Sequence, residues 1–217
     1  MQSVKLLSLN IGKPVEMAYQ GKSVSTGIYK KAVEDRVYLS FLNLEGDAQA
    51  DLVNHGGPDK AVCVYCSEHY AMWEGKLQRS LAYGTFGENF TVAGLEESQV
   101  HIGDIFELGT VRLQISQPRQ PCFKLGGKLN QPELPLWVQQ TGCTGYYFRV
   151  LKEGHVAPGQ TFRLAERHPA AVSVAEANRL KYHDKSDFDG IRTLLAVEAL
   201  ADSWRESFQK RLSAADN

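Results

Sequence analysis

Short runs of β-favouring residues, separated by glycine-containing turns, make up most of the first 166 residues of this chain. Turn signals such as Gly103-Asp104, Gly109-Thr110 and Pro158-Gly159 lie between the runs, and these residue types favour chain reversal. Few helical patterns intervene, so we predict a closed or nearly closed β-barrel rather than a doubly wound sheet. The predicted strands are 4–9, 37–42, 61–65, 105–108, 111–115, 146–151 and 161–164, with peripheral helices over 67–81 and 134–140.

Apolar residues recur at helical spacing after Pro169. The capping-box pattern that begins helices occurs twice, at Ser173 and at Ser203, and a further helix is predicted over 188–200. One face of the last helix carries Trp204, Phe208 and Leu212. We therefore predict a mainly β domain over 1–168, with its core at about 27–166, and a three-helix appendage over 169–217. Three short helices have little core of their own, so we expect them to pack on the barrel or on a second subunit of a homodimer.

Composition excludes several classes of protein. The 217 residues carry a formal net charge of -1 and are 43% hydrophobic, as in an ordinary soluble domain. No basic field indicates nucleic-acid binding, and no apolar run is long enough to cross a membrane. The first residues lack the features of a signal peptide, and four cysteines do not make a disulfide framework. We expect a cytoplasmic protein with free thiols.

The segment 116–125, SQPRQPCFKL, places Cys122 directly after a predicted strand. Pro118 and Pro121 fix the backbone direction around it. Arg119 and Lys124 would favour the thiolate of Cys122, which is the form that attacks or binds metal. A lone cysteine is often only a small buried hydrophobic residue, so the pattern leaves both interpretations open.

A second candidate site is the loop 54–60, NHGGPDK, which precedes a predicted strand. Gly56 and Gly57 permit close backbone approach, so their N–H groups could form an anion-binding nest. Lys60 would add a positive charge, and His55 lies beside the glycines. The same residues also suit a plain turn before a strand.

The segment 86–90, FGENF, holds two polar side chains beside a glycine and between aromatic residues. Taken alone, Gly87, Glu88 and Asn89 are as typical of a structural loop as of a binding site.

The other cysteines give a weaker signal. Cys63 and Cys66 have the spacing of zinc and redox sites, but strand alternation places them on opposite faces. His69 could add a ligand, yet zinc would still lack a clear fourth. Cys143 has no cationic neighbours in the sequence. Buried or incidental thiols are the favoured interpretation of all three.

Taken in order, four segments resemble the motifs of the MOSC domain, the sulfurase carboxy-terminal module that handles the molybdenum cofactor. These segments are 55–61 (HGGPDKA), 86–90 (FGENF), 101–106 (HIGDIF) and 116–125 (SQPRQPCFKL). The spacing and the helical tail resemble the YiiM group in particular, and the resemblance covers nearly the whole chain.

This resemblance implies a β-barrel that binds a molybdopterin-type cofactor, with Cys122 as the protein ligand to molybdenum. Cys63, Cys66 and Cys143 match no metal position of the family. The implied activity is two-electron reduction of N-hydroxylated compounds, such as 6-hydroxylaminopurine, hydroxylamines and amidoximes, to amines or amidines. No flavin, haem or iron–sulfur pattern is present in the sequence, so a separate electron-donor protein is implied.

The residue chemistry agrees with this role, because a soft thiolate suits a metal that cofactor sulfurs already hold. The cofactor's phosphate and pterin edges need cations and hydrogen-bond donors. The residues expected to bind the cofactor are His55, Gly56, Gly57, Lys60, Gly87, Glu88, Asn89, Arg119 and Lys124.

Two alternatives remain at this stage. One is a non-catalytic carrier of the cofactor or of its sulfur. The other is a cysteine hydrolase that uses Cys122 with His55, although no third orienting residue stands out.

Overall fold

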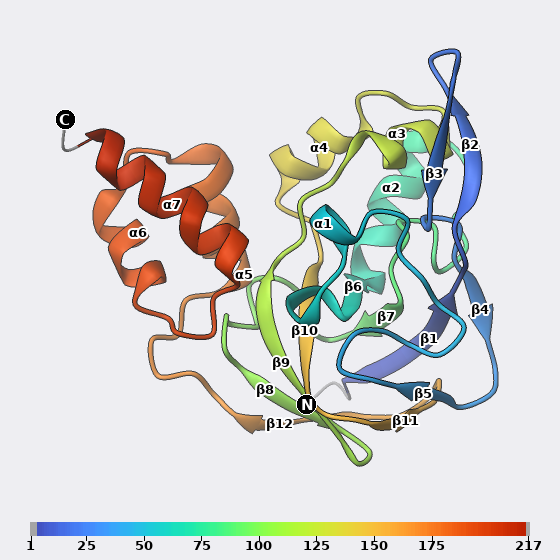
Figure 1. Ribbon diagram of the computed structural model, residues 1–217, viewed down its shortest axis with the longest axis horizontal. Helices are drawn as coiled ribbons and strands as arrows, with labels where there is room; N and C mark the ends of the chain where they lie inside the picture. The colour runs from blue at the N-terminus through green and yellow to red at the C-terminus, as the bar shows by residue number, and fades with distance from the viewer. Residues whose placement is uncertain (1–3, 216–217) are drawn as a thin grey trace.

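The computed structural model describes residues 4–215, and its main element is one curled eight-stranded sheet (Figure 1). The strand order is β12-β8-β9-β10-β6-β7-β1-β4, in which β6 and β7 run parallel and the other neighbours antiparallel. The bounds are β1 Lys5–Ile11, β4 Lys31–Val33, β6 Val62–Cys66, β7 Phe90–Ala93, β8 Ile105–Leu108, β9 Val111–Pro118, β10 Tyr146–Lys152 and β12 Phe162–Glu166.

The sheet curls until its β12 edge reaches β1. The amide of Leu6 donates to the carbonyl of Gln160 at 2.9 Å, and the amide of Phe162 donates to the carbonyl of Val4 at 3.0 Å. These bonds nearly close a barrel, which leaves few unpaired backbone groups at that edge. The predicted β-barrel is confirmed.

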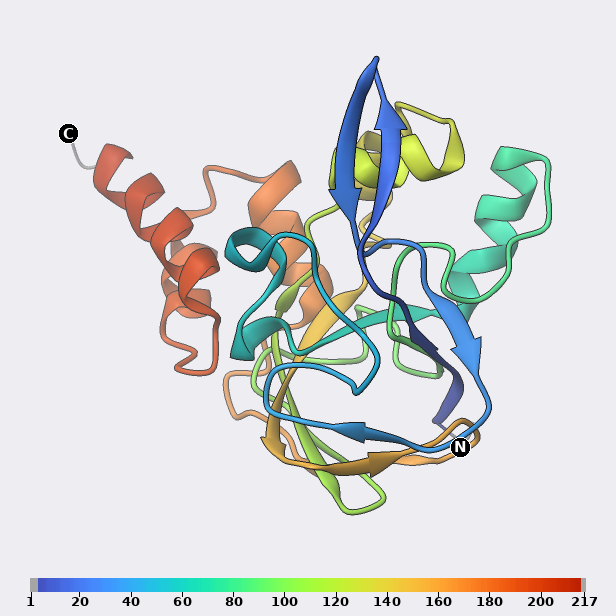
Figure 2. The same ribbon diagram turned by 45° about the vertical axis from the view of Figure 1, so that its right-hand side comes forward.

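Two smaller strand pairs flank the barrel. β5 (Val37–Leu39) pairs with β11 (Gly154–Val156). β2 (Val15–Tyr19) and β3 (Lys22–Thr26) form a hairpin that projects from the barrel (Figure 2). The sequence did not predict this hairpin, because its strands are polar and mostly exposed and so lack an apolar alternation. The short strands β4, β7 and β11 were also missed.

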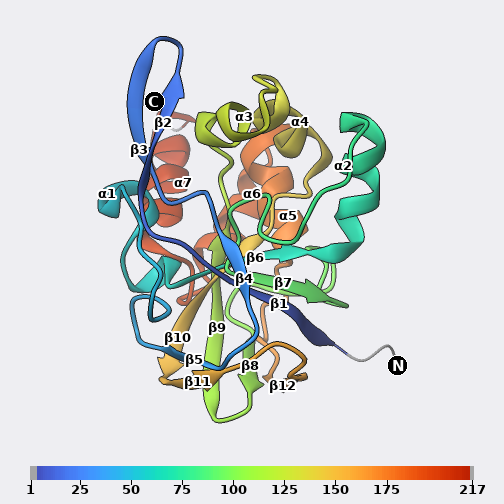
Figure 3. The ribbon, with the colours of Figure 1, turned by 90° about the vertical axis from the view of Figure 1, so that its right-hand side faces the viewer.

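Alternation along β6 divides the molecule into two apolar layers. Val62, Val64 and Cys66 face the main core inside the barrel. Tyr65 faces a second cluster, which includes Trp73 and covers the outer face of the sheet. The helices of that cluster lie on one side of the sheet (Figure 3). They are α2 (Tyr70–Leu77), α3 (Phe123–Leu129) and α4 (Leu134–Thr141).

The predicted helix over 67–81 consists of a 3₁₀ turn (Ser67–His69) followed by α2. The helix predicted over 134–140 is α4. Helix α3 was not predicted, because Gly126 and Gly127 lower the helical propensity of this short segment.

The tail contains α5 (Val174–Asn178), a π-helical turn (Arg179–His183), α6 (Phe188–Leu195) and α7 (Asp202–Ala215). It packs on the barrel, because the amide of Ala201 donates to the carbonyl of Ser116 and its apolar residues join the barrel core. Trp204 and Phe208 are buried within this one chain. The three-helix unit is confirmed, and the boundary between the two domains stays a prediction.

Two details of the predicted tail were wrong. Ser173 caps α5 as predicted, with its hydroxyl accepting from the amide of Glu176. Ser203 does not cap α7, because the helix begins at Asp202 and the Ser203 hydroxyl instead donates to Gln117 of the barrel. The middle helix ends at Leu195 rather than at residue 200. A tertiary contact is present at each end, because Ser203 bonds to Gln117 and the Arg205 guanidinium of α7 donates to the carbonyl of Leu195 at 2.6 Å.

Among residues 4–215, no helix has the length and apolar character that crossing a membrane requires.

Candidate active-site cleft

A cleft lies where the outer face of the barrel meets α1 (Leu52–His55) and the loops beside it. Segments 26–28 and 48–51 form one wall, and β6, β10 and the end of β9 supply residues of the other. Most of the predicted site residues line this cleft: His55, Lys60, Gly87, Asn89, Arg119, Cys122 and Lys124. The predicted residues that do not line it are Gly56, Gly57 and Glu88.

Arg119 follows β9 and is the most buried cation of the cleft, at 6% exposed. Its backbone amide donates to Gly145, and its guanidinium donates to the carbonyl of Phe86 at 2.5 Å. No carboxylate of the described residues 4–215 lies within ion-pair distance of it. Burial acts to lower the pKa of Arg119, and Cys63 and Tyr147 are the main groups that raise it on balance. Burial raises the pKa of this thiol and this phenol, so both are uncharged at neutral pH and do not neutralise the guanidinium. The cleft therefore contains a buried positive charge with no matching carboxylate, an arrangement that favours an anionic ligand.

Cys122 lies at the mouth of the cleft, immediately before α3. It is partly exposed, and its side chain makes no capping hydrogen bond with the helix. The next residue, Phe123, is half-exposed and packs at a tilt against Tyr19 of the projecting hairpin, with ring centroids 5.0 Å apart. The thiol of Cys122 is therefore accessible from the cleft.

A second thiol, Cys63, faces the same cleft from β6. It is 7% exposed, and burial raises its pKa even though Arg119 acts in the opposite direction. The sequence assigned Cys63 no role in the site. Strand alternation was the signal that could have found it, because alternation places Cys63 on the outer face of β6 when Cys66 faces the core.

His55 is the last residue of α1, and Lys60 ends the 3₁₀ turn Pro58–Lys60 that follows. Asp51 caps α1 by accepting from the amides of Val53 and Asn54. Burial lowers the pKa of His55, and the nearby Arg119 cation lowers it further. Burial also lowers the pKa of Lys60, whose ammonium donates to the carbonyl of Asn54 at 2.9 Å. The loop thus presents a neutral imidazole and a cation to the cleft.

The predicted anion nest at Gly56 and Gly57 is not formed. Gly56 is extended, with φ -111° and ψ -174°, and Gly57 has φ 90° and ψ 170°. These angles differ from the alternating helical conformations of a nest. Gly57 instead allows the chain to turn into the 3₁₀ turn Pro58–Lys60. The glycines shape the loop, and Lys60 is the group that reaches the cleft.

Gly87 and Asn89 build the cleft wall. Gly87 has φ 81°, and a Cβ atom there would lie 2.6 Å from Ile28, so a side chain would not fit. The Asn89 amide oxygen accepts from the Cys63 amide at 3.1 Å, and its nitrogen donates to Asn10 and to Asp47. All these bonds are within the protein, so Asn89 holds three segments of the wall together.

Glu88 lies behind the wall and is fully buried. One of its carboxylate oxygens accepts from Tyr70, Gly84 and Thr91. Its other oxygen has no hydrogen-bond partner within the described residues. Glu88 therefore supports the cleft from behind and does not face it directly.

The lining has an excess of positive charge. Among the described residues that line the cleft, the one carboxylate is Asp51, and the cations are Lys30, Lys60, Arg119 and Lys124. Lys30, which the sequence did not indicate, is neutralised by a buried ion pair with Asp47. Arg119 has no carboxylate partner among residues 4–215, so it differs in kind from Lys30. This asymmetry depends on contacts between distant segments, which sequence patterns do not reveal.

Two family profiles match the chain. The MOSC domain matches residues 51–163, and the YiiM-like, 3-alpha helix domain matches residues 172–215. The Bacillus subtilis protein "Uncharacterized protein YflK" is 54% identical over 206 residues, which cover 95% of this chain and 93% of that protein. A protein of Gibberella moniliformis named "Reductase" is 34% identical over 179 residues, which cover 81% of this chain and 32% of that protein.

The crystal structure of YiiM from Geobacillus stearothermophilus has the same fold as this chain. The TM-score is 0.83 at 40% sequence identity, and the match covers 96% of this chain and 99% of that one.

Proposed function

Because the chain belongs to the MOSC domain family and carries a YiiM-like three-helix domain, we propose that it is a molybdenum-cofactor-dependent reductase of N-hydroxylated compounds. Its substrates are 6-hydroxylaminopurine, hydroxylamines and amidoximes, and its products are the corresponding amines or amidines. The Gibberella moniliformis relative, whose name is "Reductase", supports an oxidoreductase.

The single observation that carries the proposal is that Arg119 is buried without a carboxylate partner among the described residues. A buried guanidinium without a carboxylate is costly in the free protein, because burial removes its hydration without supplying an opposite charge. A negatively charged cofactor would supply that charge. Lys60 and Lys124 line the same cleft and could contact a phosphate.

The donor set also fits the cofactor. Cys122 offers an accessible thiol at the mouth of the cleft, and thiolate is a ligand that suits a metal already bound to cofactor sulfurs. Cys63 lies deeper and its pKa is raised by burial, so it is the poorer ligand of the two. We therefore assign Cys122 as the protein ligand to molybdenum.

When bound, the cofactor supplies the two-electron chemistry, and the protein supplies binding and electrostatics. The substrate takes up two electrons and two protons, and its N–O bond is replaced by N–H with release of water. Arg119 and Lys60 neutralise the anionic cofactor in this arrangement, while the neutral imidazole of His55 faces the reaction space. The electrons come from a separate donor protein, and we place the reaction in the cytoplasm.

The experiment is to produce the full chain in cells that make molybdopterin and to measure molybdenum per chain. Turnover of 6-hydroxylaminopurine and benzamidoxime is then followed by chromatography, with reduced methyl viologen as the electron donor. We expect about one molybdenum per chain and formation of adenine and benzamidine.

The matched variants are Cys122→Ser and Cys63→Ser, which change the two thiols of one cleft. Turnover should be lost in the first and kept in the second. Molybdenum without turnover in the wild type would favour the carrier alternative. Turnover in the absence of molybdenum would refute the proposal.

A further inference from the structure

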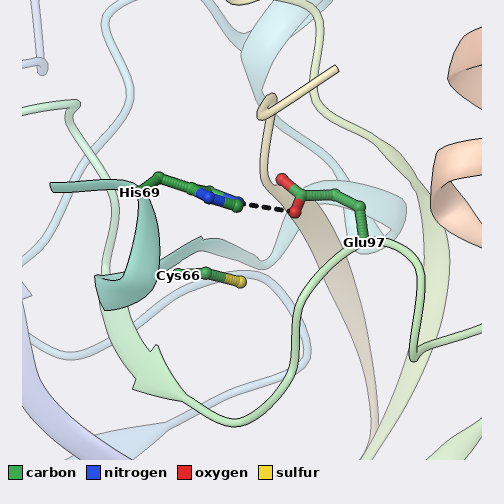
Figure 4. Close-up of side chains that lie close together, drawn as sticks. All are labelled: Cys66, His69 and Glu97. Atoms are coloured by element: carbon green, nitrogen blue, oxygen red, sulfur yellow. Dashed lines mark hydrogen bonds and ion pairs between the residues drawn. The ribbon is translucent and has the colours of Figure 1, made fainter. Parts of the chain in front are cut away.

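Three side chains of the types that ligate metals lie together on the opposite face of β6 from the cleft. Cys66 ends β6, His69 ends the 3₁₀ turn before α2, and Glu97 lies in the loop after β7. All three side chains are buried, and they point into one shared space (Figure 4). The sequence showed Cys66 and His69 close together, and the fold adds Glu97 to them.

The donor atoms are close to the spacing that a metal requires. One ligand atom from each of Cys66, His69 and Glu97 lies within 4.8 Å of the others, and His69 Nε2 lies 2.7 Å from Glu97 Oε2. Ligand atoms around tetrahedral zinc are separated by roughly 3.3 to 3.8 Å, given the usual Zn–N and Zn–S bond lengths. Shifts of about 1 Å would therefore bring the donor atoms of Cys66, His69 and Glu97 to this spacing.

A cavity of about 280 Å³ at the junction with the tail leads to this cluster. His69, Glu97 and Cys143 line it from the barrel side, and Asn178 and Arg179 line it from the tail. The Asn178 side chain is buried, and its Oδ1 has no hydrogen-bond partner among the described residues. A buried amide oxygen of this kind is expected to face water or a ligand, so the cavity offers a polar entry path.

Cys143 is the candidate for the fourth donor. It lines the same cavity as His69 and Glu97, and it lies between Gly142 and Thr144, the two residues to which Asn178 of the tail donates. Thiolates and a neutral imidazole are the forms that bind a divalent cation, so metal binding would release protons from this group of side chains.

We propose that Cys66, His69, Glu97 and Cys143 form a zinc site. Two sulfur donors, one imidazole and one carboxylate make up a donor set that binds zinc in preference to magnesium or calcium. The thiol of Cys66 donates to the carbonyl of Leu95 at 3.0 Å, so binding zinc as a thiolate requires that this hydrogen bond break and the thiol proton leave.

The site is structural. Its ligands come from β6, the 3₁₀ turn before α2, the loop after β7 and the loop before β10. Asn178 of α5 donates to Gly142 and Thr144 beside Cys143. Zinc would therefore fix the loops on which the tail rests. This role is independent of the cleft, because Cys63 and Cys122 lie elsewhere.

The test uses the full chain with Cys63→Ala and Cys122→Ala as a background, so that thiols of the cleft do not bind zinc. Zinc affinity is measured by competition with a chromophoric chelator, and ligand type is read from the thiolate-to-cobalt absorption after substitution with Co²⁺. We expect one zinc per chain with a dissociation constant at or below about 1 µM. Zinc should also raise the thermal midpoint.

Two variants of this background then test the ligands. Glu97→Gln keeps an acceptor for the amide of Gly145 but removes the anionic ligand. Cys143 is a partly exposed loop residue, so Cys143→Ala should not disturb folding. Each should weaken zinc binding at least tenfold, and Cys143→Ala should also halve the thiolate absorption. Absence of stoichiometric zinc in the folded background protein, or a zinc affinity in the two variants equal to that of the background protein, would overturn the proposal. Molybdenum content and turnover of the wild type test the cleft separately.

Discussion

Replacing Arg119 by methionine should weaken cofactor binding while it stabilises the cofactor-free protein. The side chain is buried and lacks a carboxylate partner within residues 4–215. Loss of one charged partner in a desolvated pair costs about 2 to 5 kcal/mol, which is a roughly 30- to 4,000-fold loss of affinity for an anionic cofactor. Replacing a poorly compensated buried charge by an apolar side chain is neutral or favourable. Arg119→Met also loses the bond to Phe86, so we expect a net gain of about 1 to 3 kcal/mol in unfolding free energy.

The assay combines two measurements on one set of preparations. Urea unfolding of cofactor-free protein gives the stability, and molybdenum retained after extensive dialysis gives the binding. Arg119→Lys is the matched control, because it keeps the charge but lacks the planar pair of donors. Its molybdenum retention should fall between those of the wild type and Arg119→Met. A cofactor-free Arg119→Met protein that is less stable than wild type and still retains molybdenum would refute this reasoning. Arg119 would then be a structural residue.

Three further predictions follow from other parts of the structure. Lys60→Glu reverses a charge that lines the cleft and should weaken molybdenum retention on dialysis by about 2 to 4 kcal/mol, whereas equal retention would remove Lys60 from the binding site. Trp204→Ala should lower the unfolding free energy by about 3 to 5 kcal/mol, because the indole is 1% exposed, yet molybdenum per folded chain should be unchanged. Burial lowers the pKa of Lys128 from 10.5 to about 8. The unfolded chain therefore binds more protons between these values, and stability should rise with pH over that window by up to about 3 kcal/mol. Urea unfolding of Lys128→Met across this pH range should lack the rise, and an equal slope in both proteins would contradict the assignment.

The sequence predicted the barrel because its strands alternate strongly and its turns are marked by glycine. It failed where local signals were weak, as in the polar β2–β3 hairpin and in α3, which contains Gly126 and Gly127. It also failed where distant contacts override a local pattern. Ser203 matches a capping box, yet its hydroxyl bonds to Gln117 of the barrel.

The candidate site was predictable where a single segment carries the chemistry. Cys122, Arg119 and Lys124 come from one stretch, and the structure places all three on the cleft. The positions of Cys63 and Glu88 relative to the cleft depend on which way a strand or loop faces, so the sequence did not give them. Glu97 is far from Cys66 in the chain and meets it only through the fold. Cys143 likewise reaches the cavity beside His69 and Glu97 only through the fold.

The most direct test of the central claim is X-ray absorption at the molybdenum edge of cofactor-loaded protein. The wild type and the Cys63→Ser variant should show the same number of sulfur ligands, and Cys122→Ser should show one sulfur fewer with an oxygen or nitrogen in its place. An unchanged sulfur shell in a loaded Cys122→Ser protein would contradict the claim that Cys122 binds the metal.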